Sequence, residues 1–260
     1  MAFLQVNYMS RALNRATNFN AFIPMDTFEN SEQVKSTKPM RALYLLHGYT
    51  GGQFDWTCGA RIQELSSKHN VAVFMPCGNN SFYLDDENKR ELFGEYVGYE
   101  LIKYTRGIFQ LSNKREDTII GGLSMGGYGA IRNGLKYSEN FGSIIALSSA
   151  LIINNIANIS PDFRDDVADY GYYTRIFGDL NQLQVSDKNP EYLIRELKNK
   201  NMDVPNIYMA CGTEDFLLKE NRAFHEFLLD ESISREYEEG AGEHSWDFWN
   251  QYIEKAFMVI

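Results

Sequence analysis

Hydrophobic residues follow two patterns along the chain. Short apolar runs alternate with longer segments whose apolar residues recur every three or four positions. The runs predict buried strands and the longer segments predict helices. Strands are expected at residues 42–46, 71–75, 118–120, 143–147 and 207–210, and helices at 60–68, 95–110, 126–137 and 216–229. This alternation is typical of a mostly parallel sheet with helices on both faces.

The two ends of the chain extend this pattern. Loose alternation over residues 1–24 predicts two antiparallel strands at a sheet edge, joined by a polar turn. The polar stretch 29–39 predicts a loop. Residues 233–238 predict a late strand, and 246–257 predict a closing helix.

Residues 151–204 break the alternation. This segment is polar and irregular, and it contains Pro161 and Pro190. It is too long for a plain loop in a compact domain, so it predicts short helices inserted above the strand ends. Insertions at that place form substrate-binding caps. We therefore expect one domain over residues 1–260, with a cap-like insertion at about 151–204.

Charge and composition narrow the classes of partner. The chain has 260 residues, of which 44% are hydrophobic, and a formal net charge of −10. Although a domain averages roughly 150 residues, one parallel sheet accommodates this length. The negative charge repels phosphate backbones, and no Lys- and Arg-rich stretch offsets it. Nucleic acid is therefore not an expected partner.

The sequence also bears on the compartment. No run of about 18 apolar residues occurs, so no membrane-spanning helix is expected. The first residues lack the basic start and apolar run of a secretory signal. Cys58, Cys77 and Cys211 are few, odd in number and widely spaced. They are interpreted as reduced thiols of a cytoplasmic protein.

The sharpest chemical signal is the motif G-x-S-x-G at residues 122–126. It joins the expected strand at 118–120 to the expected helix at 126–137. A serine on such a tight turn is exposed above the sheet, and Gly122 and Gly126 leave space where a Cβ would collide. Ser124 is therefore the predicted nucleophile. The N–H of Met125, at a helix N-terminus, is a predicted donor to developing negative charge.

A serine nucleophile needs a base, and histidine is the usual one. His244 lies in a glycine-containing loop after the late strand and before the closing helix. The order Ser, acid, His along the chain is that of the α/β-hydrolase fold, which makes His244 the predicted base. His69 and His225 fall in expected helices and are interpreted as surface or packing residues.

The acid is expected in the loop that follows the strand at 207–210. Glu214 and Asp215 both qualify by position. Asp215 is favoured by its shorter side chain, and Glu214 remains the alternative. Its role is to hold the tautomer of His244 and to stabilise the imidazolium. Cys211 lies on the strand itself and is interpreted as a packed thiol.

A second oxyanion donor is expected in the turn His47-Gly48-Tyr49, directly after the strand at 42–46. In this fold the donor is a backbone N–H of that loop. The register assigns it to Tyr49, as the partner of Met125. His47 is then expected to orient the loop and not to act as a base.

Four segments together resemble a known family: LHGYTGG, GLSMGGYGA, CGTEDFLL and EGAGEHSWDFWN. They are similar to the esterase D group of α/β-hydrolases. This group includes tributyrin esterases, acetyl and feruloyl esterases of carbohydrate esterase family one, and S-formylglutathione hydrolases. The resemblance implies an acyl-enzyme mechanism on short-chain or aromatic carboxylic esters, without cofactor or metal. It supports Ser124, Asp215 and His244 as the triad, with Tyr49 and Met125 at the oxyanion hole.

The substrate is less constrained than the mechanism. Acyl esters of plant cell-wall sugars or of small alcohols are expected, so the partner is a small-molecule or oligosaccharide ester. Trp246 is the predicted substrate contact. The aromatic residues of the insertion either line the pocket with it or belong to the core; they are Phe163, Tyr170, Tyr172 and Tyr173.

Three other functions remain compatible with these residues. One is thioester hydrolysis of the S-formylglutathione type, with Cys58 near the oxyanion loop as a regulatory or a packed thiol. Another is a catalytically silent binding protein on a hydrolase fold, against which the intact triad argues. The third is acyl transfer to an alcohol, which uses the same residues.

Overall fold

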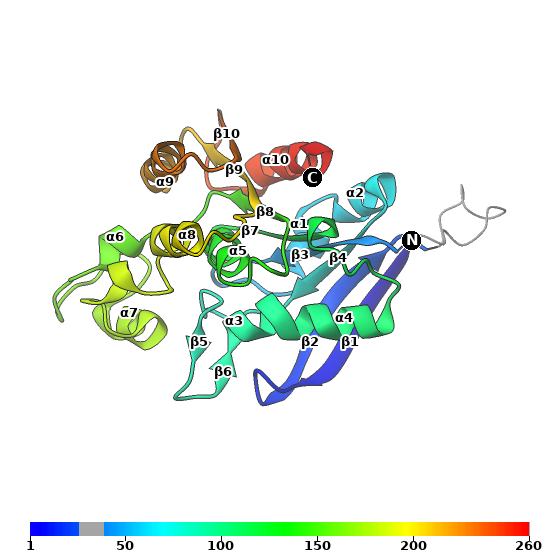
Figure 1. The fold of residues 1–260 in the computed structure, drawn as a ribbon, viewed down its shortest axis with the longest axis horizontal. Helices are drawn as coiled ribbons and strands as arrows, with labels where there is room; N and C mark the ends of the chain where they lie inside the picture. Colours follow the sequence, from blue (N-terminus) through cyan, green and yellow to red (C-terminus); the bar gives the residue numbers. More distant parts are fainter. Residues whose placement is uncertain (26–38, 260) are drawn as a thin grey trace.

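The core of the protein is a twisted, mostly parallel sheet (Figure 1). The computed structural model describes residues 1–25 and 39–259. Within them, eight strands form this sheet in the order β1-β2-β4-β3-β7-β8-β9-β10. They are β1 (Ala2–Ser10), β2 (Arg15–Ile23), β3 (Arg41–Leu46), β4 (Val71–Pro76), β7 (Thr118–Leu123), β8 (Ser143–Leu147), β9 (Asn206–Gly212) and β10 (Arg235–Gly240). A separate short hairpin pairs β5 (Asp85–Asp86) with β6 (Glu91–Leu92).

The strand pairing confirms the predicted topology. β1 and β2 form an antiparallel hairpin, and β2 pairs antiparallel with β4 at one edge of the sheet. From β4 to β10 every pairing is parallel. The predicted loop at 29–39 lies, except for residue 39, outside the described residues.

Helices cover both faces of the sheet. They are α1 (Asp55–Gly59), α2 (Ile62–His69), α3 (Phe93–Glu95), α4 (Leu101–Ile108), α5 (Met125–Lys136), α6 (Ile153–Ile156), α7 (Tyr170–Phe177), α8 (Pro190–Asn199), α9 (Leu218–Asp230) and α10 (Trp246–Val259). α1, α2 and α10 lie on one side of the sheet, and α4, α5 and α8 lie on the other (Figure 1). The helix expected at 95–110 is divided, because a π-helical turn at Tyr96–Glu100 joins α3 to α4.

The hydrophobic core is divided by the sheet into two clusters. Side chains alternate along each strand between the two faces. In β3, Leu43 and Leu45 pack with α2 and α10, while Tyr44 and Leu46 pack with α4 and α5. A strand buried on both faces is therefore apolar along its buried length, as β3 is after Arg41.

The insertion at 151–204 contains α6, α7, a 3-10 turn at Leu183–Val185 and α8. This confirms the expectation of short helices. Arg132 of α5, although buried, reaches the insertion and donates to the Asp187 carboxylate at 2.6 Å. Tyr128 Oη donates to the Lys188 carbonyl at 2.6 Å. The predicted aromatic residues of the insertion belong to the core or pack against it: Phe163, Tyr170, Tyr172 and Tyr173.

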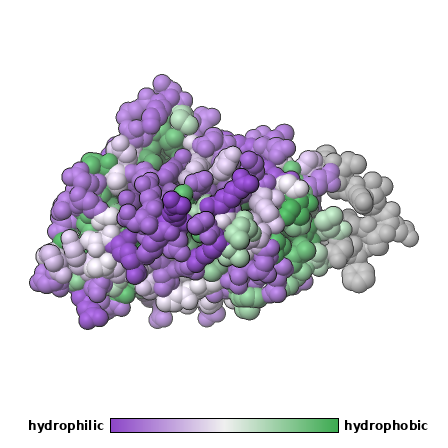
Figure 2. Space-filling view, turned by 90° about the horizontal axis from the view of Figure 1, so that it is seen from below, coloured by the Kyte–Doolittle hydropathy of each residue, from purple (hydrophilic) through white to green (hydrophobic). Residues whose placement is uncertain are grey.

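The surface seen in Figure 2 is mostly hydrophilic, with small hydrophobic areas between the polar side chains. A membrane-crossing helix must be about 20 residues long and apolar throughout. No helix in residues 1–25 and 39–259 meets both conditions.

Candidate active site

Ser124 lies between the end of β7 and the start of α5, on the strand–turn–helix that the sequence predicts. Its backbone has φ 55° and ψ −119°, a conformation that is costly for a residue with a Cβ. Two hydrogen bonds hold it there: Ser124 N–H donates to the Leu147 carbonyl at 2.9 Å, and Ala150 N–H donates to the Ser124 carbonyl at 3.0 Å. The surrounding structure thus stabilises a strained turn of the kind that presents a nucleophile.

The two glycines of the motif have the predicted steric role. A Cβ on Gly122 would lie 2.3 Å from the Gly126 carbonyl oxygen. A Cβ on Gly126 would lie 2.4 Å from the carbonyl oxygen of Leu46. The first turn of α5 therefore packs directly against the end of β3. This contact brings the loop that contains Tyr49 beside the turn that contains Ser124.

Asp215 and His244 are brought together by the loops that follow β9 and β10. His244 Nδ1 lies 2.8 Å from Asp215 Oδ2, and Leu217 N–H donates to Asp215 Oδ1 at 2.9 Å. Burial alone would raise the pKa of Asp215, but hydrogen bonds from His244, Leu217 and Ser148 outweigh it and hold this pKa below its ordinary value. An ionised Asp215 fixes the proton of the imidazole on Nδ1, which leaves Nε2 as the acceptor.

Glu214, the alternative acid, has a different environment. Its side chain is exposed and accepts hydrogen bonds from Gly242 N–H at 2.5 Å and from Thr213 Oγ1 at 2.8 Å. The backbone hydrogen bond from Gly242 is the main cause that lowers the pKa of this carboxyl. The structure thus places Asp215 on the imidazole, and Glu214 on the backbone of the loop that precedes His244.

Ser124 and His244 line one cavity of about 490 Å³. In the described part of the chain no hydrogen bond joins Ser124 Oγ to His244 Nε2. In hydrolases without substrate this bond is often long and shortens only in the complex. Tyr49 and Trp246 line the same cavity. The other lining residues are Gly48, Thr50, Gly51, Asp55, Cys58, Gly59, Leu123 and Trp249.

His47 is buried behind the loop that contains Tyr49. Its Nδ1 lies 2.7 Å from the Gly48 carbonyl oxygen, and its Nε2 accepts a hydrogen bond from Gly78 N–H at 2.8 Å. Tyr83 Oη donates to the His47 carbonyl at 3.0 Å. These contacts are those of a neutral imidazole that orients the loop, as the sequence suggested. Burial lowers the pKa of His47.

The buried His47 predicts a loss of stability in acid. The unfolded chain binds a proton at this site near pH 6.5, and the folded protein binds it only at lower pH. The free energy of unfolding should therefore fall as the pH drops below about 6.5, by at most about 1.4 kcal/mol per pH unit from this one group. Urea unfolding at pH 7, 6 and 5 measures this slope.

The slope should be smaller in a His47→Asn variant than in the native protein. His69→Asn is the control, because the pKa of His69 is also lowered by burial but its ring is only half-buried at the end of α2. It should change the slope less. Equal slopes for the native protein and His47→Asn would contradict the neutral state of His47.

The predicted oxyanion donor Met125 and the predicted substrate contact Trp246 each stand at the start of a helix. Met125 is the first residue of α5, so its N–H belongs to the turn whose donors have no partner within the helix. Trp246 opens α10, and its indole meets the rings of Trp56 and Trp249 edge-on, with centroids 5.2 Å away in each case. A Cβ on Gly59 would lie 2.5 Å from the Trp246 ring, so the indole packs tightly against that backbone.

The remaining histidine and the cysteines are not part of the predicted triad. His225 stacks on Tyr237 with centroids 4.5 Å apart, which is a packing contact. Cys211 is buried, and burial together with the Asp215 charge raises its pKa to about 12, so it stays a thiol. Cys58 is exposed in the cavity, and all three cysteines are free. No three His, Cys, Asp or Glu side chains of the described residues are grouped as a metal site.

Sequence reasoning missed three residues beside the predicted base and acid. Phe216 is exposed and its ring centroid lies 4.6 Å from that of His244; Trp249 meets His244 edge-on at 4.9 Å. Ser148 is buried at the end of β8. Phe216 and Trp249 lie within two of the family motifs, but the motifs gave them no role. Ser148 carried no signal in the sequence.

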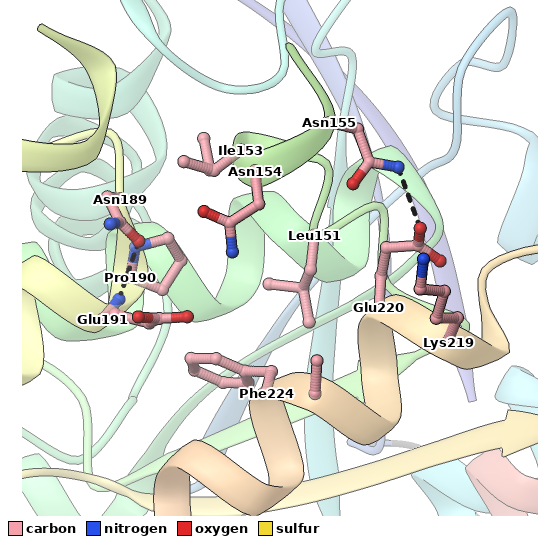
Figure 3. A pocket seen from close by; sticks show the side chains of 11 residues that line it. Leu151, Ile153, Asn154, Asn155, Asn189, Pro190, Glu191, Lys219, Glu220 and Phe224 are labelled. Atoms are coloured by element: carbon pink, nitrogen blue, oxygen red, sulfur yellow. Dashed lines mark hydrogen bonds between the residues drawn. The ribbon is translucent and has the colours of Figure 1, made fainter. Parts of the chain in front are cut away.

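A second cavity, of about 340 Å³, lies between the insertion and α9 (Figure 3). Leu151, Pro190 and Phe224 are among its apolar lining residues, and Asn155 Nδ2 donates to Glu220 Oε1 at 2.8 Å beside it. It shares no lining residue with the cavity of Ser124 and His244. The two cavities are therefore separate.

Comparison with known proteins gives consistent results. Residues 10–259 match the Esterase family. An acetyl esterase from Caldicellulosiruptor saccharolyticus is 55% identical over 258 residues, which cover 99% of this chain and 97% of that one.

Solved structures agree with this family. FphF, a fluorophosphonate-binding serine hydrolase from Staphylococcus aureus, is 27% identical with a TM-score of 0.86, over 99% of this chain and 97% of that one. The S-formylglutathione hydrolase FrmB from the same organism is 28% identical with a TM-score of 0.83, over the same shares. The chain therefore belongs to the Esterase family and is a carboxylic ester hydrolase with the α/β-hydrolase fold.

Proposed function

We propose that Ser124, Asp215 and His244 form the catalytic triad of this serine carboxylesterase. The 2.8 Å contact between His244 Nδ1 and Asp215 Oδ2, beside the cavity that Ser124 lines, is the observation that carries the proposal. His244 Nε2 removes the Ser124 proton as Oγ attacks the ester carbonyl. The imidazolium then protonates the departing alcohol, and water clears the acyl-enzyme by the same steps.

The negative charge of each tetrahedral intermediate would be stabilised by the N–H groups of Tyr49 and Met125. Each such donor is typically worth roughly 3–4 kcal/mol in the transition state. The packing of Gly126 against the end of β3 supports this pairing, because it holds the two backbone segments together.

The proposed substrates are esters of acetyl and other short acyl groups. Trp246, Trp249 and Leu123 supply apolar lining to the cavity, which suits a small uncharged acyl group. The 55% identical relative is named an acetyl esterase. The alcohol would be a plant cell-wall sugar or a small alcohol, and the insertion at 151–204 would act as the cap that selects it.

A hydroxycinnamoyl acyl group, such as feruloyl, is the second candidate. A pair of tyrosine rings favours it. Tyr49 lines the cavity, and its ring centroid lies 5.8 Å from that of Tyr172 in the insertion. An aryl acyl group could stack beside such a pair.

Thioester hydrolysis of the S-formylglutathione type is less well supported, although FrmB has the same fold. The Asp55 side chain lines the cavity, and the protein has a net charge of −10. Glutathione thioesters carry net negative charge, so both features repel them. The same features do not affect a neutral acetyl ester.

A substrate panel tests these assignments. We expect kcat/KM for p-nitrophenyl acetate to exceed that for methyl ferulate and for S-formylglutathione by at least about tenfold. Asp55→Asn should raise the S-formylglutathione rate relative to the acetate rate about two- to fivefold, because one repulsive charge across a wet cavity costs roughly 0.5–1 kcal/mol. Asparagine keeps an acceptor for Gly52 N–H, which the Asp55 carboxylate binds at 3.1 Å.

Two outcomes of the panel would contradict the proposed substrate. A higher rate on S-formylglutathione than on acetate would replace the ester assignment by the thioester one. A higher rate on methyl ferulate would make the hydroxycinnamoyl group the preferred acyl group.

A further inference from the structure

Ser148 lies directly behind the acid of the proposed triad. It follows β8, is fully buried, and adopts a left-handed φ of 46°, which is unusual for a serine. Its N–H donates to the Ala210 carbonyl at 2.8 Å, which fixes it beside β9. A polar side chain in such a strained and buried place calls for a specific role.

The hydroxyl of Ser148 joins two elements of the site. Trp249 Nε1 of α10 donates to Ser148 Oγ at 3.0 Å. Because the indole N–H occupies an acceptor position of Oγ, the serine proton is directed to another group. Two side chains beside Ser148 can take part: the carboxylate of Asp215 and the thiol of Cys211, and the Ser148 hydroxyl lowers the pKa of both. The ionised carboxylate is the stronger acceptor, so we assign the serine proton to Asp215.

Asp215 thus has two donors at hydrogen-bonding distance, His244 Nδ1 and Leu217 N–H, and the Ser148 hydroxyl beside it stabilises its charge as a third. The indole that anchors Ser148 also meets the His244 ring edge-on, with centroids 4.9 Å apart. Trp249 therefore contacts the base directly and reaches the acid through Ser148.

A second set of bonds holds this corner of the molecule together. Asn221 of α9 is fully buried; its Oδ1 accepts from Ser149 N–H at 3.1 Å, and its Nδ2 donates to the Ser149 carbonyl at 2.9 Å and to the Leu217 carbonyl at 2.8 Å. The end of β8 and the loop after Asp215 are therefore tied to one side chain. Ser148 and Asp215 cannot separate easily.

We propose that Ser148, anchored by Trp249, is a positioning residue that orients the Asp215 carboxylate toward His244. The inference rests on the proposed triad. Without this hydroxyl, the carboxylate keeps two donors and can rotate, and the imidazole loses its fixed direction toward Ser124. A misplacement of about 1 Å costs a catalytic constellation up to about a hundredfold in rate.

The chain offers a matched pair of variants, Ser148→Ala and Ser149→Ala. Both residues are fully buried neighbours, and both changes remove one hydroxyl. The Ser149 hydroxyl has no hydrogen-bond partner within residues 1–25 and 39–259. We expect Ser148→Ala to lower kcat on p-nitrophenyl acetate about tenfold to a hundredfold, with KM changed less than about twofold. Ser149→Ala should stay within about twofold in both.

The pH profile separates positioning from a general loss of structure. In Ser148→Ala the charge of Asp215 is shared with fewer donors and attracts the imidazolium more strongly. The inactive, protonated form of His244 is then more stable. The fall of kcat/KM on the acid side of the pH profile (the acid limb) should therefore begin at higher pH than in the native protein. Cys211, the other titratable group beside Asp215, does not interfere, because its pKa is about 12. The limb should not move in Ser149→Ala.

Trp249→Phe supplies a second measurement, because it removes the indole N–H but keeps a ring. In a double-mutant cycle its effect on kcat and that of Ser148→Ala should be non-additive. Equal kcat values for Ser148→Ala and Ser149→Ala, additive effects in the cycle, or an unmoved acid limb would overturn the proposal. Ser124→Ala, measured in parallel, distinguishes a failure of the Ser148 proposal from a failure of the proposed triad. If Ser124→Ala retains activity, the triad itself is wrong.

Discussion

Replacing Ser124 by alanine is expected to lower kcat for p-nitrophenyl acetate by about 10⁴-fold or more. Without Oγ no acyl-enzyme can form, and only binding and the oxyanion donors remain to accelerate direct attack by water. The fold should persist, because Ser124 Oγ makes no hydrogen bond within the described residues. Alanine also has a Cβ, so the cost of the positive φ at this position is the same for both residues. The free energy of unfolding should change by less than about 1 kcal/mol.

Steady-state kinetics and urea unfolding measure the two quantities on the same preparation. A fluorophosphonate probe adds a direct chemical readout, since it should label the native protein and fail to label Ser124→Ala. Ser149→Ala is the control for loss of a buried hydroxyl near the same strand ends, and it should still be labelled. Turnover near the native value in Ser124→Ala would show that another group attacks the ester.

The parts of the fold and site that the sequence predicted are those encoded by short segments. A strand buried on both faces is apolar along its buried length, as β3 is after Arg41 and β8 is after Ser143, so its type can be predicted without knowing its neighbours. The turn at Ser124 was recognised from a local motif, although only Gly122 avoids backbone of the motif itself; the contact that Gly126 avoids is with the carbonyl oxygen of Leu46 in β3.

What the sequence left open depended on contacts between distant segments. Glu214 and Asp215 are adjacent, and only Gly242 N–H, 28 positions away, shows that the first of them binds the loop backbone. Ser148 was missed because its partners, Trp249 and Asp215, come from other elements. The π-helical turn at Tyr96–Glu100 was also unforeseen, since one inserted residue leaves the apolar spacing of a helix nearly unchanged.

The adjacency of the two carboxylates leads to the sharpest remaining test. Asp215→Asn should lower kcat about 10³- to 10⁴-fold, with little change in size or packing. The asparagine Nδ2 can donate to the imidazole where the carboxylate accepted. His244 would then carry its proton on Nε2 and could not accept the proton of Ser124.

Glu214→Gln is the matched control, because it removes a charge from the neighbouring residue. A glutamine Oε1 can still accept from Gly242 N–H, so the loop before His244 should keep its conformation and kcat should stay within about fivefold of the native value. Kinetics on p-nitrophenyl acetate and thermal unfolding of both variants provide the comparison. If Glu214→Gln lost activity as severely as Asp215→Asn at equal stability, the acid would be shared between the two residues or belong to Glu214. If only Asp215→Asn lost activity, the carboxylate that lies 2.8 Å from His244 Nδ1 would be the one that fixes the tautomer of the base.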